Sequence, residues 1–223
     1  SEIGHLITEN LFITIINATS DEEAIKVQID KTLIAKSELL KAMSEVKNLP
    51  EAALWQGSRA DYLSKASTVG VLSTPNEDIR SLSELALYGL KGLCAYLKHA
   101  NALGYSSDEI DAFVQRALAK LVEDNLTGEN LTALVLEIGK WGVDAMALLD
   151  KANTESYGHP EITKVKLGTG KRPGILISGH DLRDLEMLLE QSKDSGIDVY
   201  THGELLPAHY YPDFKKYEHF VRN

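Results

Sequence analysis

The chain has 223 residues, of which 43% are hydrophobic and 25% charged, so it is long enough to bury a core in one large or two smaller domains. Its 23 basic and 33 acidic residues give a net charge of −10, and no segment concentrates Lys and Arg, which argues against a nucleic-acid partner. No apolar run reaches the roughly 18 residues that cross a bilayer, and the first residues lack a signal-peptide pattern. We therefore expect a cytoplasmic protein without a membrane partner.

Residues 1–153 are predicted to be helical, because their apolar side chains recur every three or four positions and β-branched alternation is absent. One predicted stripe consists of Ile25, Ile29, Leu33, Leu40 and Met43. A second consists of Ile110, Phe113, Val114, Ala117, Leu118 and Leu121. Each stripe should pack on another helix, so this part reads as a helical bundle domain, incomplete at its N-terminus.

Capping patterns predict where helices begin and end. The three predicted starts are Thr74 with Pro75 and Glu77, Ser106 with Glu109, and Thr127. Gly104 is expected to end the helix between the first two, and the helix after Thr127 should run towards Asn153.

The single cysteine, Cys94, cannot form a disulfide within the chain, and one thiolate cannot by itself hold an iron-sulfur cluster. It shares the apolar side of a predicted helix with Leu90, Leu93 and Leu97. Since the sequence places no base or cation beside it, we expect a core thiol rather than a nucleophile.

Residues 154–223 follow a different pattern. After a linker rich in Gly and Pro, the segment GILIS at 174–178 predicts a buried strand, Asp181 can cap a helix, and IDVYT at 197–201 predicts a second strand. Strand, helix and strand form a parallel unit, as at the start of a Rossmann-like α/β domain. Two strands alone leave sheet edges open, so the domain reads as truncated, and pairing with another copy in a homodimer is a further expectation. The predicted fold is mainly α, with a parallel α/β part at the end.

Candidate metal ligands follow both predicted strands. In parallel sheets ligands bind beyond the carboxyl ends of the strands, and neighbouring strands lie ~4.8 Å apart. His180 and Glu204 could therefore reach a common ion or cluster, and imidazole with carboxylate suits iron, zinc or manganese. The alternatives are that both are ordinary loop residues, or that His202 and His209 complete a zinc-like site with Glu204. The other histidines, which show no ligand spacing and read as surface or capping residues, are His5, His99, His159 and His219.

Several stretches of this sequence resemble the hybrid cluster protein family, also known as hydroxylamine reductases or prismane proteins. The densest stretches are KANTESYGHPEITKVKLGTGKRPGILISGHDLRDLEMLLEQ, at 151–191, and IDVYTHGELLPAHYYPDFKKY, at 197–217. Upstream, LALYGLKGLCAYLKHANALGYSSDEI is similar to the helical domain of that family. The resemblance thus spans most of the chain.

The resemblance implies an iron-sulfur oxidoreductase. In the family, the histidine of the SGHDL motif and the glutamate of the THGE motif are ligands of a hybrid iron-sulfur-oxygen cluster (4Fe-2S-2O), and these motifs place them at His180 and Glu204. The implied reaction is reduction of hydroxylamine to ammonia, with nitric oxide reduction and protein S-nitrosylation as related activities. A small-molecule substrate and an electron-donor protein are the implied partners.

The sequence departs from the family pattern in its cysteines. The family carries a four-cysteine motif for a conventional iron-sulfur cluster and further cysteines for the hybrid cluster, and none of these is present. The chain therefore reads as an internal fragment that binds neither cluster by itself and is inactive alone. Two alternatives remain: a fragment of a nickel-iron carbon monoxide dehydrogenase, and a non-catalytic helical interaction module.

Overall fold

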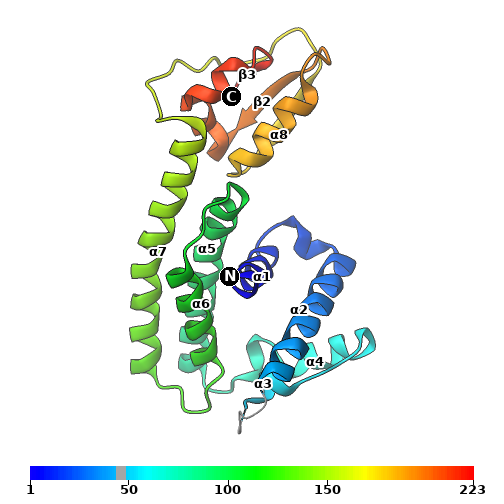
Figure 1. Ribbon diagram of the computed structural model, residues 1–223, viewed down its shortest axis with the longest axis vertical. Coiled ribbons are helices and arrows are strands. Elements are labelled where there is room, and N and C mark those ends of the chain that lie inside the picture. The colour runs from blue at the N-terminus through cyan, green and yellow to red at the C-terminus, as the bar shows by residue number, and fades with distance from the viewer. Residues whose placement is uncertain (44–48) are drawn as a thin grey trace. The chain divides into compact units, whose positions relative to one another are not determined.

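The computed structural model describes residues 1–43 and 49–223, and these fall into two units (Figure 1). The first unit comprises Ser1–Lys98 and Ser107–Met146, and the second comprises His99–Ser106 and Ala147–Asn223. Two long helices therefore contribute residues to both units. The predicted domain division at residue 153 stays a prediction, although it falls inside a helix that continues to Tyr157.

The helical prediction for the first part of the chain is confirmed. The helices are α1 (Glu2–Ile13), α2 (Glu22–Ala42), α3 (Glu51–Leu54), α4 (Tyr62–Val69), α5 (Glu77–Ala102), α6 (Asp108–Leu121) and α7 (Gly128–Tyr157). Short 3-10 helices lie between some of them: η1 (Asn17–Ser20), η2 (Arg59–Asp61) and η3 (Val71–Ser73). Within the described residues, no helix combines the length and the apolar character needed to cross a membrane.

The two predicted apolar stripes of the first unit differ in how deeply they are buried. Ile110, Phe113, Val114 and Ala117 on α6 are buried, as expected, and Phe113 stacks on Trp141 with 5.1 Å between ring centroids. The stripe on α2 is only partly buried, however, and Met43 at its end is exposed. α2 does contact α1, as expected, but its stripe is less completely covered than the stripe on α6.

Two helices begin slightly later than predicted. Asn76, rather than Thr74, accepts a hydrogen bond at 3.1 Å from the backbone N–H three residues later at the start of α5. Ser107, rather than Ser106, does the same for α6. Thr127 caps α7 as predicted. Neighbouring Ser, Thr and Asn residues are all good caps, so the sequence alone does not decide between them.

The second unit contains a small parallel sheet, which confirms the predicted fold class. Its elements are β1 (Gly174–Ser178), α8 (Leu182–Ser192), β2 (Asp198–His202), the 3-10 helices η4 (Gly203–Tyr210) and η5 (Pro212–Lys216), and β3 (Phe220–Arg222). The strand order is β1-β2-β3, and both pairs are parallel. The sequence reading missed β3, because three residues are too few to show a strand pattern.

The expectation that β1 is a buried strand is wrong. Its residues alternate between exposed and half-buried, and Leu176 is 68% exposed. The reason is that one face of β1 meets the core and the other does not: Ile177 packs against the buried cluster of the second unit, whereas Leu176 lies on the opposite face. A continuous apolar run is therefore no guide to burial here.

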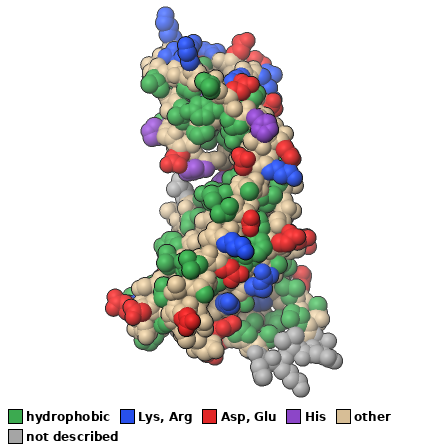
Figure 2. Space-filling view, turned by 90° about the vertical axis from the view of Figure 1, so that its left-hand side faces the viewer, with side chains coloured by type: hydrophobic (Ala, Val, Ile, Leu, Met, Phe, Trp, Pro, Cys, Tyr) green, Lys and Arg blue, Asp and Glu red, His purple; other side chains and the backbone are tan. Residues whose placement is uncertain are grey.

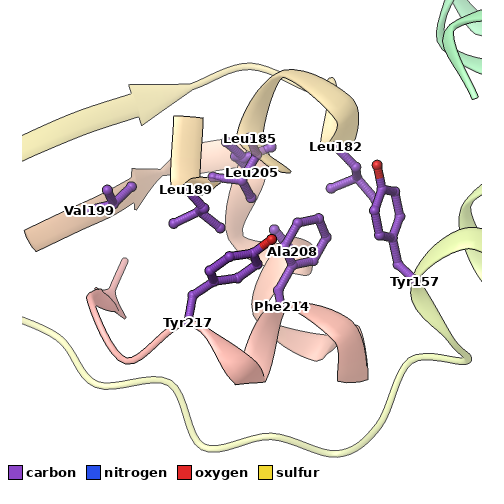
Figure 3. Close-up of a cluster of buried hydrophobic side chains, with 9 residues drawn as sticks. All are labelled: Tyr157, Leu182, Leu185, Leu189, Val199, Leu205, Ala208, Phe214 and Tyr217. Atoms are coloured by element: carbon purple, nitrogen blue, oxygen red, sulfur yellow. The ribbon is translucent and has the colours of Figure 1, made fainter. Parts of the chain in front are cut away.

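The core of the second unit lies between α8, β2 and the two 3-10 helices (Figure 3). Leu182, Leu185 and Leu189 face it from α8, and their spacing of three and four residues puts them on one side of the helix. The other members are Tyr157, Val199, Leu205, Ala208, Phe214 and Tyr217. This cluster supports the segments that follow β1 and β2.

Candidate functional site

The two loops that carry His180 and Glu204 leave neighbouring strands at the same end of the sheet. Ser178 and His202, the last residues of β1 and β2, are paired in the parallel register. A glycine follows each strand, and Gly179 and Gly203 have φ angles of 124° and 56°. Positive φ angles favour glycine, so the backbone can turn sharply just beyond each of the two strands.

The structure brings the two predicted side chains together. His180 Nε2 lies 2.9 Å from Glu204 Oε2, close enough for a hydrogen bond. The two side chains are 63% and 78% exposed. A polar contact so exposed contributes little to stability, so it does not hold the fold together. The pair is instead an accessible imidazole and carboxylate at the strand ends.

The loop before α8 is held by Asp181, the residue next to His180. One carboxylate oxygen, Oδ1, accepts hydrogen bonds from the backbone N–H groups of Arg183 and Asp184 at 2.8 and 3.2 Å, which caps the helix. The other, Oδ2, lies 3.1 Å from Nδ1 of His99. Burial acts to raise the pKa of Asp181, but the hydrogen bond and charge of His99, with the capping N–H groups, outweigh it and lower the pKa.

The contact between His99 and Asp181 was not foreseen. His99 was expected to be an ordinary surface or capping histidine, yet its side chain is only 15% exposed. The two residues are 82 positions apart, and no sequence pattern links them.

The alternative zinc site is not assembled by the described side chains. His209 is buried, its Nε2 lies 2.8 Å from Thr201 Oγ1, and its ring stacks on Phe220 with 4.0 Å between centroids. His202 is exposed at the end of β2. Across residues 1–43 and 49–223, no three or more His, Cys, Asp or Glu side chains are grouped so that they could hold a metal ion.

His5 and His159 are exposed, as expected for surface histidines. The same expectation is wrong for His219, which is buried with Nε2 at 3.0 Å from Ser192 Oγ. Cys94 is fully buried in the helical unit, and burial raises the pKa of its thiol to about 12. The prediction of a core thiol is confirmed.

Known proteins resemble the whole chain. The model of the Prismane/CO dehydrogenase family matches residues 1–223. A hydroxylamine reductase of Desulfovibrio desulfuricans is 56% identical over 222 residues, which cover 99% of this chain and 41% of that protein. Hydroxylamine reductases of Clostridium perfringens and Porphyromonas gingivalis strain W83 are 54% and 57% identical over 100% and 97% of this chain, and over 42% and 40% of their own lengths. The chain thus spans about two fifths of the length of these relatives.

Proposed function

Because this chain belongs to the Prismane/CO dehydrogenase family, we propose that it supplies His180 and Glu204 as ligands to a hybrid iron-sulfur-oxygen cluster in a longer oxidoreductase. The observation that carries the proposal is the 2.9 Å approach of His180 Nε2 to Glu204 Oε2 beyond the ends of two parallel strands. Ligand sites in parallel α/β sheets lie at this end of the strands.

The donor set fits part of such a cluster. An imidazole nitrogen and a carboxylate oxygen both bind iron, and both side chains are exposed enough to be reached. Iron-sulfur clusters also need thiolates, and Cys94 is buried in the helical unit. The proposal therefore requires the thiolate ligands, and those of the conventional cluster, to come from outside these 223 residues.

The two residues have different roles in this proposal. His180 is the fixed ligand, because the neighbouring Asp181 is tied to the start of α8. Glu204 is the exchangeable ligand, because a carboxylate can bind through one oxygen or two, or withdraw. Its side chain is also the more exposed of the pair. When bound, the cluster supplies electrons and iron positions for reducing a small nitrogen compound.

We propose hydroxylamine as the substrate, since relatives that match nearly all of this chain are named hydroxylamine reductases. Its reduction to ammonia and water consumes two electrons and two protons, so an electron-donor protein is part of the proposal. Nitric oxide is the second candidate substrate. The name of the matching family also covers carbon monoxide dehydrogenases, but the names of the relatives favour the nitrogen chemistry.

The test uses the longer protein that contains this chain, with Glu204→Gln compared against Glu218→Gln. Glu218 is an exposed glutamate of the same unit and serves as the matched control. We expect Glu204→Gln to abolish hydroxylamine reduction and change the electron paramagnetic resonance of the catalytic cluster, while the conventional cluster still loads. The control should behave as wild type.

Three results would contradict the proposal. Retained hydroxylamine reduction in the Glu204→Gln variant would remove the assigned role of this carboxylate. Absence of iron and acid-labile sulfide from the longer protein would favour the non-catalytic helical module. If replacing His202 alone removes bound metal as replacing Glu204 does, a separate metal site at the end of β2 would be favoured.

A further inference from the structure

The contact between His99 and Asp181 lies directly behind one of the proposed ligands. We infer that His99 is a positioning residue for His180, acting through the carboxylate of Asp181. This inference rests on the proposed function, because it assigns His99 a task only if His180 is a cluster ligand. His99 is distant in sequence from the two loop motifs, so the inference extends the site beyond them.

Both carboxylate oxygens of Asp181 take part in hydrogen bonds. Oδ1 accepts the two backbone N–H groups at the start of α8, and Oδ2 faces His99 Nδ1 at 3.1 Å. An ionised carboxylate only accepts hydrogen bonds, so His99 Nδ1 carries the hydrogen of this bond. The bond connects the loop after β1 to the end of α5, within the second unit.

The contact between His99 and Asp181 is much less exposed than the contact between His180 and Glu204. The side chains of His99 and Asp181 are 15% and 21% exposed, whereas those of His180 and Glu204 are 63% and 78% exposed. A hydrogen bond to a charged group gains strength when water is largely excluded. The contact between His99 and Asp181 is therefore the better anchor, and the contact between His180 and Glu204 is the more easily exchanged.

The helix cap alone leaves the loop less defined. Gly179 precedes His180 with a φ of 124°, and a glycine gives the backbone freedom that other residues lack. A cap fixes Asp181 relative to α8, but not the rotation of the loop about that helix end. Holding the second oxygen from α5 fixes the peptide between His180 and Asp181. The imidazole keeps its own side-chain torsions, but the backbone from which it projects is held by a supporting contact, as is common around metal ligands.

Three substitutions distinguish the hydrogen bond between His99 and Asp181 from the helix cap that Asp181 provides to α8. His99→Leu removes the hydrogen bond, and His99→Asn can restore it, because the Asn Nδ2 group takes the place of the His Nδ1 group. Asp181→Ser keeps an oxygen that can cap α8 but cannot also reach His99. His159→Leu replaces an exposed histidine of the same unit and is the matched control.

Three readouts besides activity are measured: amide hydrogen exchange, the resonance of the catalytic cluster and the retention of its iron. Amide hydrogen exchange of residues 179–184 in this chain should accelerate in His99→Leu and Asp181→Ser and stay at the wild-type rate in His99→Asn and His159→Leu. In the longer protein, the same two disruptive variants should show a shifted resonance of the catalytic cluster and about 10- to 100-fold weaker retention of its iron against a chelator. Circular dichroism of each variant checks that the helices remain folded.

The possible results distinguish this inference from the function on which it rests. If His180→Ala leaves the resonance of the catalytic cluster unchanged, the proposed ligand is wrong, and the role of His99 falls with it. If His180→Ala alters the resonance and His99→Leu does not, only the positioning role is refuted. A failure of His99→Asn to restore exchange and resonance in a folded protein would also overturn it.

Discussion

The buried cluster of the second unit, which supports the loops after β1 and β2, allows a specific prediction for α8. Replacing Leu185 with Ala is expected to lower the free energy of unfolding of the second unit by about 2–5 kcal/mol. Leu185 is fully buried in the cluster shown in Figure 3. The substitution removes three carbon groups, which at about 0.8 kcal/mol each is about 2.4 kcal/mol of transfer free energy, and the residual cavity adds to this.

The assay must report on the second unit alone. Trp55 and Trp141 both belong to the first unit, so intrinsic tryptophan fluorescence follows the wrong part of the chain. Amide hydrogen exchange in β2 is the suitable probe, because the Val199 N–H is bonded to the His219 carbonyl at 2.7 Å within the sheet. The exchange rates of these protected amides give the free energy of opening directly.

Met187→Ala provides the matched control. Met187 lies on the same helix but is 56% exposed, so its replacement should change the free energy of opening by no more than about 0.5 kcal/mol. Equal effects of the two substitutions, or a loss below about 1 kcal/mol for Leu185→Ala, would refute the assigned inner face of α8.

Two further predictions concern titratable groups. Burial lowers the pKa of His209, although a hydrogen bond with the Arg222 backbone acts to raise it, so the unfolded chain takes up this proton more readily than the folded one. The stability of the second unit should therefore be greatest above about pH 6.5 and decline as the pH falls below it. Thermal unfolding followed across this range should show a weaker decline in His209→Gln, and an unchanged decline would contradict the prediction. Cys94, with a pKa of about 12 and no exposure, should resist iodoacetamide at about pH 8 until the protein is denatured, as mass spectrometry can measure. Modification of the folded chain would show that the thiol is not in the core.

The proximity of His180 and Glu204 could be predicted because it depends on local rules. Two short apolar strands separated by an amphipathic helix must run parallel, and parallel strands end at the same edge of a sheet. Residues that follow both strands are then neighbours whatever the rest of the chain does. The observed pairing of Ser178 with His202 is the register that this reasoning requires.

Other features could not be predicted because they depend on distant partners. The burial of β1 was overestimated, since its apolar composition does not show whether both of its faces are covered. The incomplete burial of the α2 stripe has the same origin. His99 gave no signal because its partner, Asp181, is 82 residues away and a helical position does not show what faces it.

The two proposed ligands differ in how the residue next to each is held, and this difference supports their proposed roles. Each is exposed, and each is followed directly by a residue that is anchored. After His180 the anchor is polar, because Asp181 is tied to α8 and to His99. After Glu204 the anchor is apolar, because Leu205 is 2% exposed in the core that also contains Leu185. Directional hydrogen bonds define the orientation of a neighbour more closely than apolar contacts do, so the imidazole suits the fixed ligand and the carboxylate the exchangeable one.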